Sequence, residues 1–342
     1  MNKKLYVLVT AIITLILIPI VAFAAAPFYE GKTVRIIVGM SPGGGFDTYS
    51  RIIARHMGKH IAGNPKIIVE NMPGAGSIIA ANHIYKVAKP DGLTIGHFNG
   101  GLLFDKILGR EGAEFDPIKF EYIGSYNMAE VVCALSKASG ISSIDQWVSS
   151  KKQLKFGGVG VGNLAPDNTP KILKAALGLP IQLVSGYKGT AEVRLAVEGG
   201  EVEGCCFGWE QMQSLWHDAL EKGDVIAIIQ VRPQPLPEIP NVPLAINLAK
   251  SDDARQIIEK GIHSNLIFNR PLLLPPGTPK ERLEILRNAL QATLKDKELL
   301  AETKKAQLGL NPVTGEELEK AVAGLYKVDP ALLAKIKKIL FE

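Results

Sequence analysis

Two glycine-rich segments near the start of the chain have the residue types that bind anions. The first spans residues 34–54 and consists of an apolar β-branched run, a glycine loop at residues 39–45, and apolar residues at helical spacing from about Asp47. This order is typical of a strand that leads through a loop into a helix. Because the first amides of a helix lack partners and the helix dipole is positive there, we expect this turn to attract an anion.

The second segment repeats the arrangement. Residues 66–70 form a short apolar run, a loop follows at residues 71–76, and Ser77 can cap a helix that reaches about residue 87. If the two units lie side by side in a parallel sheet, both loops open at its carboxyl edge, where open α/β sheets bind ligands. The sequence therefore predicts that one small acid contacts both loops.

The first residues are typical of a secretory signal peptide. Lys3 and Lys4 precede an apolar run at residues 5–22, and small residues follow at positions 22–26. We therefore expect cleavage after Ala24 or Ala26, so that residues 1–26 form the signal peptide and the mature protein is periplasmic. An uncleaved membrane anchor is the alternative, because the run is nearly long enough to span a bilayer.

The composition of the whole chain is that of a soluble globular protein. Its 342 residues are 46% hydrophobic and 21% charged, which allows two domains. Without Lys3 and Lys4, the basic residues fall from 39 to 37, against 34 acidic residues. This balance, and the lack of a dense basic cluster, argue against nucleic acid as a partner.

The three cysteines are Cys133, Cys205 and Cys206. An odd number cannot close into a complete disulfide framework. The segment around Cys205 and Cys206 has the pattern of a buried strand, which favours free apolar thiols. A vicinal disulfide between these two residues is the alternative, and no CxxC pattern or nearby histidine suggests a metal site.

Further units of strand, glycine turn and helix follow along the chain. Strands are expected at residues 93–97, 120–124, 131–135, 154–159, 181–184, 202–207, 225–230 and 265–268. The segment at residues 232–243 holds five prolines and is expected to cross the surface between two lobes. The fold class is therefore α/β with two lobes and a ligand cleft between them. Lobe 1 comprises residues 27–125 plus 232–342, and lobe 2 comprises residues 126–231.

With these segments in view, nearly the whole mature chain resembles the extracytoplasmic solute receptors of tripartite tricarboxylate transporters, the Bug-type receptors. The matching motifs, read in order together with Arg51, are VRIIV (34–38), PGGGFD (42–47), VENMPGAGS (69–77), PDGLT (90–94), GYKGT (186–190) and PPGTP (275–279). The resemblance implies a type II periplasmic-binding-protein fold that closes on a small carboxylate and delivers it to the permease subunits of a membrane transporter. It implies no cofactor and no metal, and we expect a monomer.

The resemblance also implies which residues bind the ligand. In the family, main-chain groups and waters of the first two loops hold the ligand carboxylate, and lobe 2 adds two turns. Carried over to this sequence, the ligand-binding residues are Ser41, Gly43, Gly44, Gly45, Phe46, Asp47, Gly74, Ala75, Gly76, Ser77, Ile78, Gly162, Asn163, Tyr187, Lys188, Gly189 and Thr190.

The sequence departs from the family pattern at several of these positions. The loop at residues 160–165 lacks the usual serines, threonines and histidine, so polar contacts are fewer or come from Asn163 and Asn168. Phe46 stands where a small residue is common, and the apolar segment 206–209 replaces a more polar one. These departures favour a ligand with an apolar or aromatic body.

Catalytic and nucleotide-binding motifs are incomplete. The sequence at residues 39–43 matches G-x-S-x-G, but Pro42 has no N–H to form an oxyanion hole. A dinucleotide fingerprint at Gly74 and Gly76 would need a small residue where Ile79 stands. We therefore predict that the chain is not an enzyme. An exported enzyme acting on an acidic substrate in the same cleft is the alternative.

Five charged or titratable positions have two interpretations each. His56 and His60 have the spacing of two metal ligands, but the basic residues around them favour a solvated helix face. Asp47 is interpreted as the N-cap of its helix, pointing away from the cleft, and alternatively as a group that binds an amine of the solute. Lys188 and Arg51 are candidates to pair with a ligand carboxylate, or are simply solvated.

Overall fold

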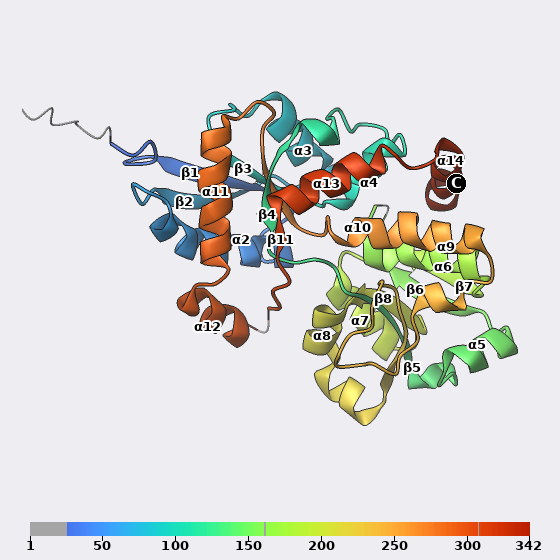
Figure 1. Ribbon diagram of the computed structural model, residues 1–342. Helices are drawn as coiled ribbons and strands as arrows, with labels where there is room; N and C mark the ends of the chain where they lie inside the picture. The colour runs from blue at the N-terminus through green and yellow to red at the C-terminus, as the bar shows by residue number, and fades with distance from the viewer. Residues whose placement is uncertain (1–25, 161, 307) are drawn as a thin grey trace, which may run out of the picture.

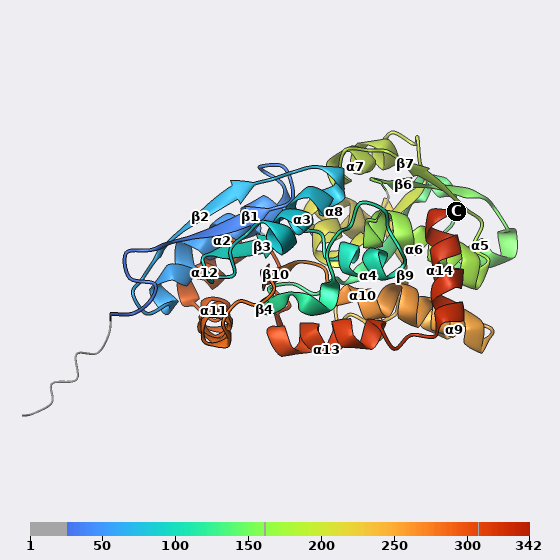
Figure 2. The same ribbon diagram turned by 90° about the horizontal axis from the view of Figure 1, so that it is seen from above.

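The computed structural model describes residues 26–160, 162–306 and 308–342. Apart from Ala26, the predicted signal peptide lies outside the described residues. Within the described ranges, none of the helices combines the length and apolar character that crossing a bilayer requires. Figures 1 and 2 show an α/β molecule with two sheets, each covered by helices.

The first sheet contains both glycine-loop units. In the described residues its strand order is β11-β4-β10-β3-β1-β2, with β1 parallel to β2 and β3, and β10 antiparallel to β3 and β4. The strands are β1 (Thr33–Val38), β2 (Lys66–Asn71), β3 (Thr94–His97), β4 (Glu121–Ser125), β10 (Pro271–Leu274) and β11 (Val313–Thr314). The three parallel strands end at one edge, as the sequence predicted.

The second sheet is formed by the middle of the chain. Among the described residues its order is β7-β6-β8-β5-β9, with β6 parallel to β7 and β8, and β5 antiparallel to β8 and β9. The strands are β5 (Val131–Ser136), β6 (Leu154–Gly158), β7 (Ile181–Ser185), β8 (Gly204–Gly208) and β9 (Val225–Gln230). The chain passes from the first sheet to the second between Ser125 and Val131.

Helices pack against both sheets and against one another (Figures 1 and 2). Those packed around the first sheet are α2 (Gly45–Met57), α3 (Ile78–Lys86), α4 (Gly101–Ile107), α11 (Lys280–Thr293), α12 (Lys297–Lys305) and α13 (Gly315–Leu325). Those in the other half are α5 (Ile144–Ser150), α6 (Thr169–Leu177), α7 (Thr190–Glu198), α8 (Trp209–Lys222), α9 (Asp252–Ile258), α10 (Ser264–Leu266) and α14 (Pro330–Phe341). Because α9 and α14 both contact α6, the C-terminal part of the chain packs on both halves of the molecule.

The strand predicted at residues 265–268 is wrong. Residues 265 and 266 end the helix α10, residues 267 and 268 form a turn, and the strand begins later, at Pro271. The reason is the Asn265 side chain, whose Nδ2 donates to the carbonyls of Lys260 and Gly261 at 3.0 and 3.1 Å and so extends the preceding helical turn. The run Pro271–Leu274, buried at every position, takes the place in the sheet.

The prediction of free thiols at Cys205 and Cys206 is confirmed for Cys205 and wrong for Cys206. Cys133 and Cys206 form a disulfide, and Cys205 is a buried free thiol. The two bonded residues face each other across the antiparallel pair of β5 and β8, with their Cα atoms 3.9 Å apart. The vicinal alternative is excluded as well, because adjacent residues on a strand point to opposite faces of the sheet.

Candidate ligand-binding cleft

The first glycine loop ends in the N-terminus of α2. The helix begins at Gly45, and the N-cap residue Gly44 offers no side-chain acceptor. The first helical hydrogen bond runs from the amide of Thr48 to the carbonyl of Gly44, at 2.9 Å. Within the described residues, the amides of Gly45 and Phe46 donate to no protein acceptor. They are the free donors of a helix N-terminus, which favours an anion.

Asp47 does not cap this helix, so that interpretation is wrong. It is the third helical residue and is 3% exposed. Its carboxylate accepts hydrogen bonds from the Gly43 amide, Arg51 Nε and Asn71 Nδ2, each at 2.9 Å. These bonds, with that to Arg51 as the largest contribution, lower the pKa of Asp47 to about 2. The negative charge of the carboxylate is therefore paired with Arg51, and its hydrogen bond to the Gly43 amide fixes the conformation of the glycine loop.

The second glycine loop lies directly beside the first, as predicted. A Cβ atom added to Gly39 would come within 2.8 Å of the Ser77 side chain. Ser77 Oγ donates to the Gly39 carbonyl at 3.0 Å, and Asn71 Nδ2 donates to the Met40 carbonyl at 3.0 Å. Ser77 therefore joins the two loops instead of capping α3 with its side chain.

Arg270 is a site residue that the sequence analysis missed, as is Glu210. It immediately precedes β10 and is 5% exposed. Its guanidinium carbon lies 4.8 Å from the ring centroid of Tyr49, 5.6 Å from that of Phe46 and 5.9 Å from that of Tyr126. A Cβ atom at Gly45 would come 3.3 Å from Arg270 Nη2, so the guanidinium lies against the start of α2. A cation and free helix amides thus meet at one point.

Glu210 of α8 faces this guanidinium from the other half of the molecule. Its Oε1 lies 3.4 Å from Arg270 Nη1, and its Oε2 accepts a hydrogen bond from Asn127 Nδ2. Burial is the main cause that raises the pKa of Glu210, and Arg270 opposes this effect. Arg270 Nε has no hydrogen-bond partner among the described residues. The guanidinium therefore retains a free donor.

A neutral histidine supports the aromatic rings beneath Arg270. His97 ends β3, and its ring nitrogens lie 2.7 Å from Ser50 Oγ and 3.1 Å from the Tyr126 hydroxyl. Burial and the nearby Arg270 lower the pKa of His97 to about 3. The imidazole is therefore uncharged at neutral pH. It is fully buried and lines neither pocket of the cleft, so it holds Ser50 and Tyr126 in place by hydrogen bonds and does not contact the cleft.

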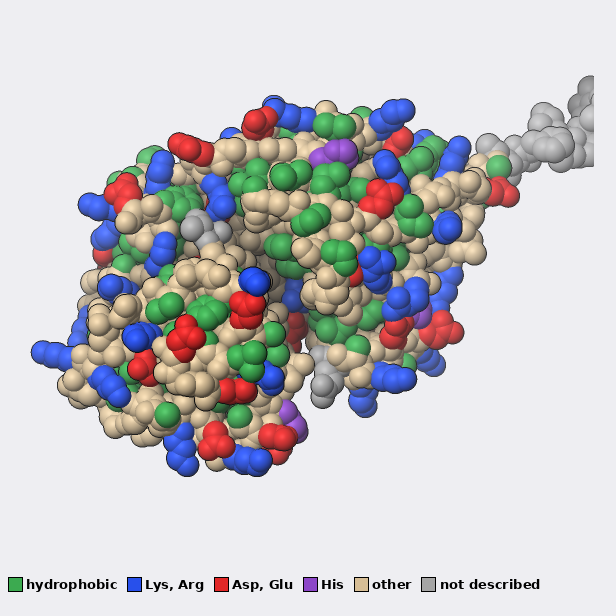
Figure 3. Space-filling model, turned by 180° about the vertical axis from the view of Figure 1, so that it is seen from behind, with side chains coloured by type: hydrophobic (Ala, Val, Ile, Leu, Met, Phe, Trp, Pro, Cys, Tyr) green, Lys and Arg blue, Asp and Glu red, His purple; other side chains and the backbone are tan. Residues whose placement is uncertain are grey.

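A cavity of about 150 Å³ lies between the two halves around these groups. Figure 3 shows the molecule hollowed between its two masses. The cavity is lined by Phe46, Asn99, Gly101, Asn127, Ala129, Glu130, Val159, Asn163, Leu164, Ala165, Pro166, Thr190, Phe207, Gly208, Glu210, Gln211, Asn265, Asn269 and Arg270. A more open pocket of about 360 Å³ adjoins it, with Gly43, Gly45, Tyr49 and Leu308 in its lining and Thr190, Glu210, Gln211 and Arg270 shared between the two.

The structure brings some of the predicted site residues to these pockets and not others. Phe46, Asn163 and Thr190 line the cavity, and Gly43 and Gly45 line the adjoining pocket. The predicted residues outside both linings are Ser41, Gly44, Asp47, Gly74, Ala75, Gly76, Ser77, Ile78, Gly162, Tyr187, Lys188 and Gly189. Ligand contact by these residues stays a prediction.

The predicted turns of the second half carry their own internal acceptors. The Asp167 carboxylate accepts hydrogen bonds from the amides of Val159 and Gly160 at 3.0 Å. The Lys188 amide donates to Glu192 at 2.9 Å, and Lys188 is exposed. These amides already have carboxylate partners. The amides of Val159, Gly160 and Lys188 are therefore not free for a ligand, unlike those of Gly45 and Phe46 at the start of α2.

The two halves touch at the edge of the cleft. Asn99 Nδ2 donates to the Gly162 carbonyl at 3.2 Å. An added Cβ at Gly162, whose φ is +88°, would come within 2.5 Å of Arg110 Nη1 and 2.7 Å of Asp105 Oδ2. Arg110 and Asp105 form an ion pair of 2.9 Å. The loop after β6 thus fits closely against α4 only because residue 162 is glycine.

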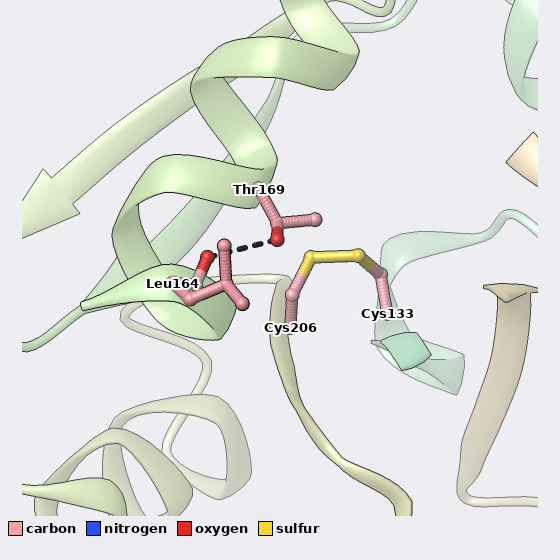
Figure 4. Close-up of a disulfide and its surroundings, with 4 residues drawn as sticks. All are labelled: Cys133, Leu164, Thr169 and Cys206. Carbon is pink, nitrogen blue, oxygen red and sulfur yellow. Dashed lines mark hydrogen bonds between the residues drawn. A yellow bond between two sulfur atoms is a disulfide. The ribbon is translucent and has the colours of Figure 1, made fainter. Parts of the chain in front are cut away.

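The disulfide lies under the opposite wall of the cleft. Figure 4 shows the Cys133–Cys206 bond close to the turn where Thr169 Oγ1 donates to the Leu164 carbonyl, a bond of 2.8 Å. Leu164 lines the cavity, and so does Phe207, the residue after Cys206. The bond therefore anchors the strand that carries one wall.

His56 and His60 are only partly exposed and are paired with acidic residues, which corrects the interpretation of a solvated face. The His56 and His60 side chains are 13% and 24% exposed and contact Glu302 and Asp296 at 2.8 and 3.1 Å. Among the described residues, His56, Asp296 and Glu298 have ligand atoms close enough to hold a metal ion. Lys59 Nζ, however, already lies 2.9 Å from Asp296 and 2.6 Å from Glu298, so an ammonium supplies the positive charge.

Comparison with known proteins connects this cleft with solute receptors. Residues 49–321 match the family model described as tripartite tricarboxylate transporter family receptor. A UPF0065 protein of Agrobacterium vitis is 26% identical over 335 residues, which cover 96% of this chain and 90% of that protein.

Solved structures share the fold. A TctC solute-binding protein from Polaromonas is 19% identical, with a TM-score of 0.66 over 91% of this chain and 98% of that chain. MatC from Rhodopseudomonas palustris, solved with bound malate, is 22% identical, with a TM-score of 0.63 over 90% of this chain and 99% of that chain. The chain therefore has the two-lobed fold of periplasmic solute-binding proteins, as the sequence predicted.

Proposed function

Because the chain belongs to the tripartite tricarboxylate transporter receptor family, we propose that it captures a small carboxylate in the cleft and delivers it to a membrane transporter. The family consists of substrate-binding receptors and not of enzymes. MatC, a structural neighbour, was solved with malate, a carboxylate.

One observation carries the proposal: the buried guanidinium of Arg270 lies against the free amides at the start of α2, with its Nε unpartnered. Hydrogen bonds to a charged group contribute about 1.5 to 3 kcal/mol each. Four such bonds would supply about 6 to 12 kcal/mol before the entropy of closure is subtracted, and micromolar binding corresponds to about 8 kcal/mol. Direct capture therefore needs no metal.

We further propose that the protein works outside the cytoplasm after removal of residues 1–26. Lobe 1, residues 27–125 plus 232–342, would close on lobe 2, residues 126–231, by bending near residues 124–127, with α9 and α14 moving with lobe 2 because they pack on α6. The ion pair of Glu130 and Arg232, 3.5 Å long, ties the chain after this crossing to the end of β9.

The first test is identification of a bound solute. Native mass spectrometry of the mature protein, followed by a thermal-shift panel of mono-, di- and tricarboxylates, should show a carboxylate that co-purifies or raises the melting temperature. Arg270→Gln should lose most of this binding, because the cation in the cleft is removed.

Arg282→Gln is the matched control. Arg282 also stacks on an aromatic ring, that of Phe28, and donates to the Asp91 carbonyl at 3.0 Å, but it lies outside both linings. It should bind ligand as the unmodified protein does. Carboxylate binding that survives Arg270→Gln unchanged, or the lack of any carboxylate ligand in the panel, would contradict the proposal.

A further inference from the structure

The charged groups of the cavity are unusual for a site that takes a polyanion. Among the described lining residues, the charged side chains are Arg270, Glu210 and Glu130, so carboxylates outnumber cations. Two or three ligand carboxylates would place additional negative charge beside these glutamates, which is unfavourable at short range in a partly desolvated cavity. The lining therefore selects against dicarboxylates and tricarboxylates.

The two glutamates differ in how they are neutralised. Glu130 has partners outside the cavity lining, Arg232 Nη1 at 3.5 Å and Asn311 Nδ2 at 3.2 Å. Glu210 has Arg270 as its cation, at 3.4 Å, which is longer than the usual 2.7 to 2.9 Å of a charge-assisted hydrogen bond. When a ligand carboxylate binds Arg270, Glu210 must share its cation and gains from a positive charge on the ligand.

The short separation of Glu210 and Arg270 also defines the ligand. Opposite charges 3.4 Å apart are complemented by an ammonium and a carboxylate on neighbouring atoms, as in an α-amino acid. A second acceptor is available, because Asn265 Oδ1 has no hydrogen-bond partner among the described residues and Asn265 also lines the cavity. One unpartnered donor, Arg270 Nε, and one unpartnered acceptor thus occur in residues around the same cavity.

The rest of the lining suits an apolar side chain. Its apolar members are Phe46, Ala129, Val159, Leu164, Ala165, Pro166 and Phe207. Most come from the second half of the molecule, opposite the start of α2. A zwitterion held at Glu210 and Arg270 would therefore place its side chain against these groups.

We propose that the cleft selects a zwitterionic α-amino acid with an apolar side chain, bound through its carboxylate to Arg270 and the first amides of α2 and through its ammonium to Glu210. This inference rests on the proposed function, since it specifies the carboxylate that the same site takes. It assigns Glu210 as the residue that determines specificity.

The test compares ligands that differ only in the group at the α-carbon. Leucine, 2-hydroxy-4-methylpentanoate, 4-methylpentanoate and isobutylmalonate share one skeleton, and alanine, valine and phenylalanine with their matched malonates extend the series. Titration calorimetry on the mature protein at pH 7.5 should show at least one amino acid binding at least 10-fold more tightly than its malonate. The acid with only hydrogen at the α-carbon, such as 4-methylpentanoate, should have an affinity between those of the amino acid and the malonate, or should show no binding.

Glu210→Gln should reduce affinity for the preferred amino acid at least 10-fold and raise that for its malonate. Glu221→Gln, an exposed glutamate of the same helix whose neighbour is His217, is the matched control and should change neither. The ligand comparison on the unmodified protein stands even if Glu210→Gln fails to fold.

Binding of malonates or other carboxylates with no binding of any amino acid would overturn this inference and leave the proposed function intact. If no carboxylate of either series or of the wider panel binds, the proposed function fails and the inference fails with it. Unchanged selectivity in a folded Glu210→Gln protein would remove Glu210 from its assigned role.

Discussion

Replacement of Asp47 by asparagine tests how the first glycine loop is held in shape. The carboxylate accepts three hydrogen bonds of 2.9 Å, from the Gly43 amide, Arg51 Nε and Asn71 Nδ2. An asparagine amide would direct N–H groups toward at least one of these donors. We therefore expect Asp47→Asn to loosen the loop that presents the α2 amides, without removing a ligand contact.

The expected magnitude follows from the pKa of Asp47, which is lowered from 3.8 to about 2. Since one pKa unit corresponds to about 1.4 kcal/mol, the native interactions stabilise the carboxylate by about 2 kcal/mol. Solvent screens part of this contribution, because the Arg51 side chain is 46% exposed. We expect a loss of roughly 1 to 2 kcal/mol in the free energy of unfolding and a decrease of about 10-fold in ligand affinity.

The effect should depend on pH. Because the folded pKa lies below the unfolded value, the contribution of Asp47 is fully present above pH 4 and is lost as the pH falls toward 2. The difference in unfolding free energy between the unmodified protein and Asp47→Asn should therefore shrink between pH 4 and pH 2.

Urea unfolding and titration calorimetry measure the two quantities. Asp145→Asn is the control, since Asp145 lies in the first turn of α5 and accepts no hydrogen bond from a described side chain. It should change the unfolding free energy by less than about 0.5 kcal/mol. Unchanged stability in Asp47→Asn would refute this reasoning. Loss of binding for amino acids alone would show that Asp47 contacts the solute ammonium.

Three further outcomes are expected. The Cys133–Cys206 disulfide links residues 73 apart in sequence, so its reduction should lower the free energy of unfolding, measured in urea, by about 4 kcal/mol. An unchanged free energy of unfolding would contradict the presence of this disulfide. The pKa of His97 is about 3 in the folded protein and 6.5 in the unfolded chain, so its neutral form contributes fully to stability above pH 6.5. The free energy of unfolding should fall by about 2 kcal/mol between pH 7 and 5, and His97→Gln should reduce this pH dependence. Gly162→Ala should weaken ligand binding in calorimetry by at least 10-fold, because its Cβ would meet the charged side chains of Arg110 and Asp105. Gly178→Ala, at a similar positive φ but in open space, should leave binding unchanged.

Local sequence patterns predicted the first half of the site. Two β-branched runs, each followed by glycines and a helical pattern, specify where strand and helix meet, and parallel pairing of β1 and β2 brings the loops together. The exception is local as well. Asp47 was interpreted as the N-cap, but the N-cap is Gly44, so the helix begins three residues earlier than this interpretation implies, at Gly45.

The rest of the site depends on contacts between distant residues. Arg270 is a single cation before a short strand, and nothing in its neighbourhood indicates that Glu210, 60 residues earlier, will face it. The disulfide has the same origin, because the register of β5 against β8 decides that Cys206, and not Cys205, meets Cys133. Periodicity specifies faces and turns, whereas pairing across lobes follows from tertiary packing.

A crystal structure of the mature protein with its co-purified or best-binding carboxylate tests the central claim most directly. The claim predicts one ligand carboxylate within 3.2 Å of both the Arg270 guanidinium and an amide of Gly45 or Phe46, enclosed between the two lobes. A ligand carboxylate bound away from Arg270, or held only by the second half of the molecule, would contradict it.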